Sequence, residues 1–307
     1  MDRSTAEAVA GRAPAELGPL LRELGDLKRV TSAGRPGSLA SRLFRRSWAA
    51  LLAGHAARDV ALAATASALA AARLGDLDFP TLVELGVPEP DALGIQRRAV
   101  SEIAVGVDPA LADDLAAAIG RLPDALGPVP PFVDALDAQP RAGVTCPGKP
   151  RIVLLPAESH AEHCLVVAVY GVLLAPPYRA DPATVFLAAL AHHFHNAAVP
   201  DSGFTGEMLL EPHLSEIIAR ASAAALRQLE PRLAAEVEAA RRVLADDRTP
   251  EGRAFHAADV IDRVVEIDQH LAAARLTMDV VLTDMELVHH GPVKAFHDRV
   301  LAEMGLP

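Results

Sequence analysis

The 307-residue sequence has few cysteines and few aromatic side chains, and it lacks an excess of positive charge. Its two cysteines, Cys146 and Cys164, are too few for a disulfide framework, which favours a reducing compartment. Aromatic residues make up 4% of the chain, so Ala, Leu and Val must build the core within an apolar content of 51%. Because Ala and Leu favour helices whereas strands favour β-branched and aromatic residues, this composition predicts an all-α fold.

Charge and hydropathy argue against two classes of partner. The 29 basic and 40 acidic residues give a net charge of −11, the opposite of the balance in a general nucleic-acid binder. The longest apolar runs, 60–72 and 164–175, are shorter than the roughly 20 residues that span a bilayer. Residues 1–7 also lack the apolar core of a signal peptide. We therefore expect a cytoplasmic protein that binds neither nucleic acid nor membranes; a homo-oligomer is compatible with the sequence.

Prolines divide the chain near its middle. Eight of the 24 prolines fall within residues 123–156, and proline breaks helices, so we predict a connector there. The connector separates a predicted N-terminal helical domain, residues 1–122, from a second predicted helical domain, residues 157–307. Within the connector, residues 152–155 are compatible with either a short buried strand or an extended segment.

Helices in the first domain are predicted from caps and apolar stripes. Ser38 is expected to cap a helix that Gly54 ends, and an Ala-rich helix is expected over residues 58–74, ended by Gly75. Further helices are predicted over 82–86, 97–105 and 109–119. A run of basic residues leads into the helix capped by Ser38 and continues within it. We favour pairing of these residues with acids elsewhere over an anion site. The run consists of Lys28, Arg29, Arg35, Arg42, Arg45 and Arg46.

The second domain has clearer helix boundaries. Helices are predicted over 157–175, 181–196, 212–229, 231–246, 251–274 and 293–304. Asp181 and Thr249 each precede a proline, which is typical of a cap followed by the first helical position. Pro176 and Pro177 are expected to end the first of these helices, and residues 201–203 have the composition of a turn.

Histidine is concentrated in this second domain. Eleven of the twelve histidines follow position 159, and neutral imidazole is a common metal ligand and proton carrier. His160 and His163 are three residues apart, so they share one face of the first predicted helix. His192, His195 and Asn196, at positions i, i+3 and i+4, are expected to share a face of the next.

A later predicted helix carries His256, Asp259 and Arg263 along one stripe. Inward-facing imidazoles and carboxylates must be satisfied, because an unpaired buried polar group is costly, and a divalent cation satisfies several at once. Nitrogen and oxygen donors without cysteine suit Mn, Fe, Co, Ni, Zn or Mg. The plain alternative for Arg263 is a salt bridge to Asp259, four residues earlier, and this is its expected role.

The order of an early Glu-His helix, a helix ending in His-Asn and a late Ala-Asp-x-Ile helix resembles the HD-domain metal-dependent phosphohydrolases. The similarity covers residues 155–275, and residues 157–168 look most like the 5′-deoxynucleotidase branch. The resemblance implies a helical bundle of HD type with His163, His195, Asn196 and Asp259 as metal ligands. The family has His-Asp where this chain has His195-Asn196, and a neutral amide oxygen is a weaker ligand than a carboxylate.

The resemblance implies a metal-dependent hydrolase of a small, anionic, nucleotide-like phosphorylated substrate. A bound divalent ion would bind a phosphate oxygen and lower the pKa of a water. The candidates for proton transfer are Glu207, Asp201 and His192. The candidates for contact with the substrate are His160, His213, His256 and Arg263.

Two alternatives remain open. One is an HD-fold oxygenase with two irons, for which His213 and His256 could supply further ligands, although Asn196 cannot bridge two irons as a carboxylate does. The other is a non-catalytic ligand-binding or regulatory module, since Asn196 stands where the family has aspartate. Metal content would separate the three functions.

Overall fold

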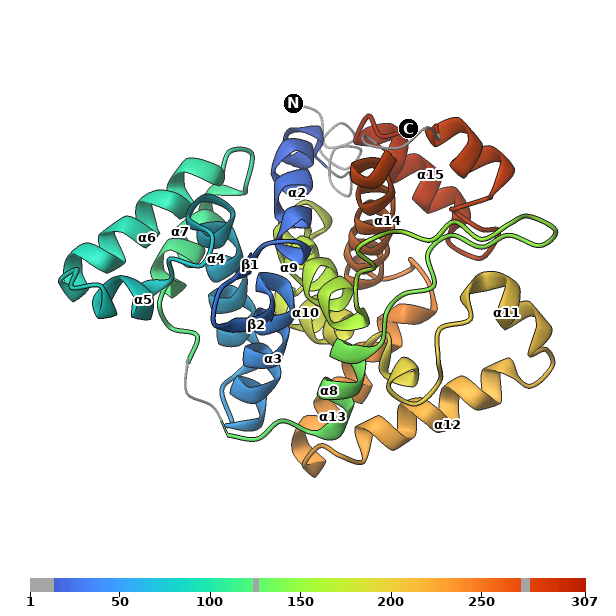
Figure 1. The fold of residues 1–307 in the computed structure, drawn as a ribbon, viewed down its shortest axis with the longest axis horizontal. Helices are drawn as coiled ribbons and strands as arrows, with labels where there is room; N and C mark the ends of the chain where they lie inside the picture. Colours follow the sequence, from blue (N-terminus) through green and yellow to red (C-terminus); the bar gives the residue numbers. More distant parts are fainter. Residues whose placement is uncertain (1–13, 124–126, 272–276) are drawn as a thin grey trace.

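We describe a computed structural model, in which residues 14–123, 127–271 and 277–307 are placed (Figure 1). These residues are mostly helical, which confirms the predicted all-α class. Strand pairing within them is confined to a small antiparallel hairpin, β1 (Thr31–Ser32) and β2 (Arg35–Ser38), and to isolated bridges. The sequence predictions for residues 1–7 and for a helix end near residue 274 concern parts outside the described residues.

The first half of the chain forms the helices expected from its caps. The Ser38 hydroxyl accepts a hydrogen bond from the Ser41 amide at 3.1 Å, and Gly75 ends the second long helix with φ +58°. The predicted helices agree with the structure to within a few residues at most ends, except that the one predicted over 97–105 begins at Glu89. The elements are η1 (Ala15–Leu17), α2 (Gly18–Gly25), η2 (Asp26–Lys28), α3 (Leu39–Leu52), α4 (Ala57–Leu74), α5 (Phe79–Glu84), α6 (Glu89–Ile103) and α7 (Pro109–Ala118).

The second half departs from prediction in five places. The connector contains a helix, α8; Pro176 and Pro177 lie inside the last turn of α9 instead of ending it; and α10 stops five residues early, at Ala191. Helix α11, which begins at the end of the predicted turn, and the π-helical turn η5 were not predicted. The elements are α8 (Pro131–Ala138), α9 (His160–Tyr178), α10 (Pro182–Ala191), η3 (Phe194–Ala197), α11 (Gly203–Leu209), α12 (Leu214–Leu226), α13 (Pro231–Ala240), η4 (Arg241–Ala245), α14 (Pro250–Leu271), the π-helical turn η5 (Val280–Asp284) and α15 (Lys294–Glu303).

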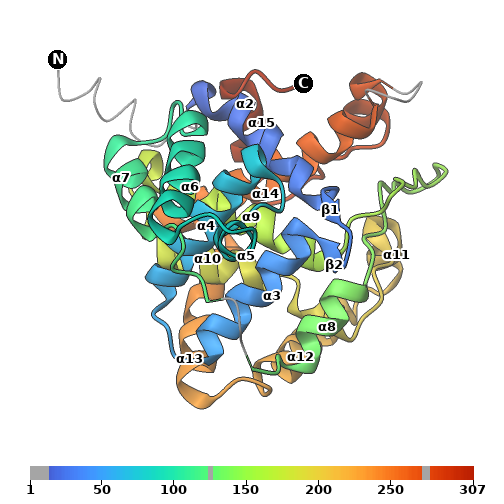
Figure 2. The ribbon, with the colours of Figure 1, turned by 60° about the vertical axis from the view of Figure 1, so that its left-hand side comes forward.

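Helix α9 is the centre of the fold. It packs against α3, α4, α10 and α14 and runs through the middle of the molecule (Figures 1 and 2). By length and composition it could cross a membrane, but 83% of its apolar window is buried by neighbouring helices, as in a core helix. Its start is fixed by a capping box, in which Ser159 and Glu162 bond each other's backbone amides.

A glycine allows α9 and α10 to pack closely. A Cβ atom built at Gly171 would lie 2.5 Å from Cγ1 of Val185, so any larger residue would force the two helices apart. The helices are antiparallel, since the start of α9 meets the end of α10. This contact places His163, in the first turn of α9, next to the residues that follow α10.

The core is continuous across both predicted domains. One cluster of buried side chains extends from Leu17 to Leu306. Within this cluster, the Trp48 ring lies 5.0 Å from that of Phe132 and 5.5 Å from that of Phe194, measured between ring centroids. Trp48 comes from α3, Phe132 from α8 and Phe194 from η3, so the connector contributes to the core. The domain division itself stays a prediction.

The part of the connector that follows α8, residues 139–156, is an extended ribbon that projects beyond the helices above α11 (Figure 1). Val144 pairs with Ile152 in an isolated antiparallel bridge. Val153 and Leu155 are 63% and 78% exposed, so the segment predicted as buried or extended is extended and partly exposed.

Candidate metal centre

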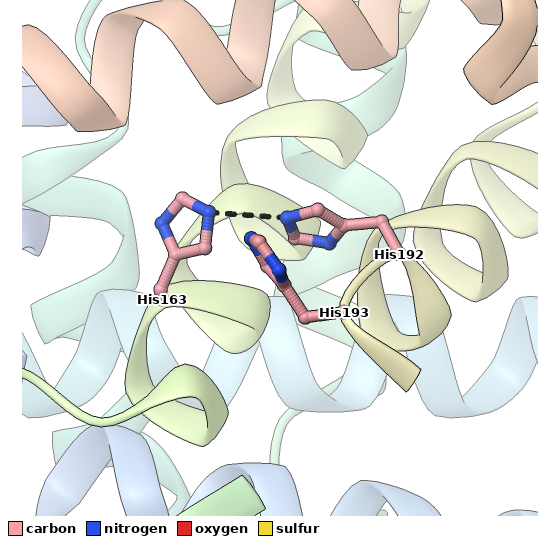
Figure 3. Close-up of side chains that lie close together, drawn as sticks. All are labelled: His163, His192 and His193. Atoms are coloured by element: carbon pink, nitrogen blue, oxygen red, sulfur yellow. Dashed lines mark hydrogen bonds between the residues drawn. The ribbon is translucent and has the colours of Figure 1, made fainter. Parts of the chain in front are cut away.

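Three side chains from three elements place ligand atoms close together. His163 comes from α9, His192 directly follows α10, and Asp259 belongs to α14. The Nε2 atoms of the two histidines are 3.0 Å apart. Oδ1 of Asp259 lies 3.3 Å from Nε2 of His163 and 3.9 Å from Nε2 of His192. Figure 3 shows the two imidazoles facing each other across this short gap.

The hydrogen bonds of the two imidazoles decide which nitrogens carry protons. A backbone carbonyl can only accept, so Nδ1 of His192, 2.6 Å from the Ala189 oxygen, is protonated. Nδ1 of His163 is 2.7 Å from the Asp262 carboxylate and therefore donates as well. In the neutral imidazoles both Nε2 atoms then carry lone pairs. Two lone pairs and a carboxylate oxygen face one another without a donor between them.

This arrangement has the dimensions of a metal site. A point equidistant from the three atoms lies about 2.0 Å from each, which is the length of a metal–nitrogen or metal–oxygen bond. Oδ1 of Asp259 is buried and has no hydrogen-bond partner among the described residues. A divalent cation at that point would relieve the repulsion among the three atoms and supply the missing partner of Asp259.

The shifted pKa values of the three groups keep both imidazoles neutral and the carboxylate ionised. Burial lowers the pKa of His163 to about 3 and that of His192 well below its usual value, so both are neutral ligands at neutral pH. Burial opposes ionisation of Asp259, but the Arg263 guanidinium holds its pKa well below the usual range. Arg263 contacts Oδ2 of Asp259 at 3.3 Å, which confirms the predicted salt bridge and leaves Oδ1 to the cluster.

A third histidine stands beside the first two. The His193 ring lies 4.2 Å from the His192 ring and 5.2 Å from the His163 ring, and Figure 3 shows it directed at the gap between them. All three offer ligand atoms within 4.8 Å of one another. Nδ1 of His193 donates to the Asn196 amide oxygen at 2.8 Å, so its Nε2 lone pair is available to an ion or a bound water.

The helical face on which the sequence analysis placed His192, His195 and Asn196 is absent from the structure. The His195 ring lies beside His193, at 5.6 Å between ring centroids, and its buried Nδ1 has no hydrogen-bond partner among the described residues. The Asn196 oxygen accepts from His193 and its nitrogen donates to the Val199 carbonyl. The prediction assumed a helix through residue 196, whereas α10 ends at Ala191 and a 3₁₀ turn follows, so the i, i+3, i+4 relation does not hold.

A second group of possible ligands consists of Glu158, His163 and Asp262, and a lysine of the protein already occupies the space between its carboxylates. The ammonium of Lys28 lies 2.6 Å from Glu158 and 2.7 Å from Asp262. A metal ion there would have to displace a buried lysine. The group is therefore an ion-pair cluster and not a second metal site.

A cavity of about 180 Å³ opens next to the cluster. Its polar lining includes Arg141, Arg263, His193, Asp201 and Glu207. His193 and Arg263 belong both to the cavity lining and to the surroundings of His163, His192 and Asp259, so the cavity reaches the edge of the cluster.

The two predicted carboxylates of the cavity differ in their bonding. Asp201 accepts from the Ala142 and Gly203 amides at 2.9 and 2.8 Å and lies 3.5 Å from His160. Its oxygens hold the loop, which argues against a role in proton transfer. The Glu207 carboxylate accepts no hydrogen bond from the described residues, and burial, then Asp201, raises its pKa.

The remaining predicted site residues lie at different distances from the three proposed ligands and from the cavity. His160 is buried with its ring 4.5 Å from that of His193, beside the cluster. His256 is buried on α14 but lines no part of the cavity, and His213 is exposed at the start of α12. Of the four residues predicted to contact the substrate, Arg263 lines the cavity, and His160 is fully buried beside the cluster.

The sequence did not indicate that Arg141, Lys28 and His193 lie at the site, although it predicted that Lys28 pairs with acids. Arg141 and Lys28 lie far along the chain from the histidines, so no spacing rule connects them. His193 had a usable signal, since it follows a strongly apolar helix within a His-His pair. Five members of the basic run pair with acids as favoured: Lys28 and Arg29 with Glu158, Asp262 and Glu266; Arg35 and Arg42 with Asp76 and Asp78; Arg45 with Asp134 and Asp137. Arg46 donates to the backbone carbonyls of Leu122 and Pro123.

Comparison with family models, with curated proteins and with solved structures finds no match to this chain.

Proposed function

We propose that the chain is a metal-dependent hydrolase of a small phosphorylated molecule, with the ion held by His163, His192 and Asp259. The observation that carries this proposal is the triangle of three unprotonated ligand atoms around one point. The order of the proposed ligands along the chain still resembles that of the HD-domain phosphohydrolases. With His192 as the second ligand, the pair His192-His193 stands where that family has His-Asp, so a histidine replaces the aspartate.

The charges around the site favour binding of a cation and leave two arginines near it. Asp259 is paired with Arg263, and the carboxylates of Glu158, Asp262 and Glu266 face the cations of Lys28, Arg29 and Arg141. Asp201 and Glu207 also line the cavity, so a divalent ion would offset their negative charge. The ion would polarise a phosphate oxygen and a bound water.

Two arginines are placed to hold that phosphate. Arg263 is partly exposed to the cavity and uses one terminal nitrogen on Asp259, with its buried Nε unpaired among the described residues. Arg141 lines the cavity and contacts Glu158 at 3.4 Å. Guanidinium groups bind phosphate oxygens in pairs, so these side chains would orient the ester toward the ion.

Glu207 is the proposed proton carrier, because it faces the cavity with its carboxylate free of hydrogen bonds from the described residues. We expect Glu207→Gln to lower kcat by about 10²–10⁴-fold, the usual contribution of a general acid or base. Because its pKa is raised, wild-type activity as a general base would fall as pH drops through that pKa, and the variant would lose this limb of the pH profile.

Steady-state rates over a pH series, with metal content measured in parallel, check this prediction. Glu238→Gln, an exposed carboxylate on α13, is the matched control and should retain wild-type rates. A Glu207→Gln protein that holds its metal and keeps wild-type kcat would remove Glu207 from the mechanism.

A second function is favoured by the ligand set itself. Two histidines and one carboxylate with open positions are also the ligands of non-haem Fe(II) oxygenases. The zinc hydrolases use a similar set, so the ligands do not decide between hydrolysis and oxygenation. The identity of the bound metal does.

The test is metal analysis of the purified full chain, followed by reconstitution with Mn, Fe(II), Co, Ni or Zn and assay on a panel of phosphomonoesters and nucleotides. We expect one ion per chain and metal-dependent release of inorganic phosphate. Substrate-dependent oxygen consumption with Fe(II) alone would favour the oxygenase. A chain that stays metal-free after reconstitution would refute both enzymes and leave a ligand-binding module.

A further inference from the structure

A buried lysine lies behind the metal ligand His163. The Lys28 side chain is 1% exposed, and its ammonium lies 2.6 Å from Glu158, 2.7 and 2.8 Å from the two Asp262 oxygens, and 3.4 Å from Glu266. Burial disfavours the ammonium, but the three carboxylates outweigh burial and raise the pKa of Lys28. The side chain is therefore charged.

The residue type suits this position. The chain has three lysines among its 29 basic residues, and one of them lies here. Several carboxylate oxygens converge on one point, where a compact ammonium with three donors fits better than a planar guanidinium. Arg29 instead binds the outer oxygen of Glu266, at 2.6 Å, from the edge of the cluster.

Asp262 connects the lysine to the metal site. Its Oδ2 atom lies 2.8 Å from the Lys28 ammonium and 2.7 Å from Nδ1 of His163. The Lys28 ammonium donates to Asp262 and fixes the orientation of its carboxyl group. Asp262 accepts the Nδ1 proton of His163, which leaves the Nε2 lone pair of His163 directed at His192 and Asp259.

We propose that Lys28 is a positioning residue for the metal centre, acting through Asp262 to hold His163 in the tautomer that binds metal. This inference rests on the proposed metal site but concerns a residue more than 100 positions away in the sequence. The N-terminal segment that carries Lys28 therefore helps to orient the proposed metal ligands. The same segment is tied to α14 by hydrogen bonds from Gln269 to the Arg22 carbonyl and from Arg29 to Gln269.

The first test needs no substitution of Lys28. In metal-free wild-type protein, nitrogen-15 NMR of the imidazoles should show His163 as the Nδ1–H tautomer with a hydrogen-bonded, downfield proton. A His163→Gln sample assigns the signal by its loss. Finding the Nε2–H tautomer at His163 would overturn the proposal.

The second test uses Lys28→Met, which keeps the length of the side chain and removes its charge. We expect the Zn²⁺ dissociation constant to rise about 10–100-fold, as for loss of other groups that orient a ligand, and the downfield His163 proton to weaken or shift. Lys28→Arg keeps the charge and should recover part of both. Arg45→Met removes a cation paired with Asp134 and Asp137 on the surface and serves as the control.

The outcomes separate this inference from the proposed function. A folded Lys28→Met protein with wild-type Zn²⁺ affinity and an unchanged His163 signal would make Lys28 a plain ion-pair residue, with the metal site intact. A wild-type protein without Zn²⁺ affinity would refute the metal site, while the tautomer would still test the positioning. Should Lys28→Met not fold, Lys28→Arg and the wild-type tautomer decide.

Discussion

Replacing His192 with alanine is expected to raise the dissociation constant for a divalent ion by more than about 100-fold, whereas His195→Ala should leave it within about twofold. Loss of a group that merely orients a ligand costs 10–100-fold, so loss of one of three ligands should exceed that range. The Nε2 atom of His192 lies 3.0 Å from that of His163, whereas the His195 ring lies beside His193, at 5.6 Å between ring centroids.

Competition titrations with Zn²⁺ or Co²⁺ measure the dissociation constants of the two variants, and far-UV circular dichroism confirms that both are folded. The two histidines are three residues apart and both partly buried, so each variant controls for the other. The reverse order, with His195→Ala the damaging change, would restore the ligand set that the sequence predicted and contradict the geometry.

Trp48→Ala is expected to reduce the free energy of unfolding by about 3–5 kcal/mol, the cost of emptying a large core site. Trp48 is fully buried and packs edge-on against Phe132 at 5.0 Å and next to Phe194 at 5.5 Å. These rings come from three separate elements, so the cavity would not close by movement of one of them. A loss of this size is a large part of the stability of a typical domain.

Urea unfolding followed by circular dichroism provides the measurement, and Trp48→Phe provides the control. The indole Nε1 has no hydrogen-bond partner within the described part of the chain. Phenylalanine therefore removes a costly unpaired N–H while keeping most of the ring, and should lose well under half as much. A Trp48→Ala loss below about 1 kcal/mol would show that this cluster does not stabilise the fold.

The helices could be predicted because their ends are encoded locally. Ser38 caps α3 and Asp181 caps α10 through their own side chains, as expected from the sequence. Gly75 ends α4 because it adopts a positive φ. Helix α8 was missed because its eight residues stand in a proline-rich segment, where composition alone argues for a connector.

The candidate site differs from the sequence prediction at one place. The proximity of His163 and Asp259, 3.3 Å apart, was expected because both lie inside regular helices, where spacing defines a face. The sequence placed His195 beside them, whereas the structure places His192 there, because the end of α10 has no capping glycine or proline to mark it. Residues 192–193 form a turn, and the helical face assumed for His192 and His195 does not exist there.

The groups that surround the ligands could not be predicted at all. Lys28 and Arg141 reach the site only through the packing of α9 against α14 and through the path of the extended ribbon. Contacts between residues 28 and 262 depend on tertiary structure, for which a single sequence carries no local signal.

The ligands lie on three elements, and this has a thermodynamic consequence. An ion at the triangle would cross-link residues 163, 192 and 259, closing loops of 29 and 67 residues that the unfolded chain cannot hold together. An ion that binds the native state alone, at a hundred times its dissociation constant, adds about 2.7 kcal/mol to stability. The metal would then be a structural component as much as a reagent, and the melting temperature would depend on the free concentration of the ion.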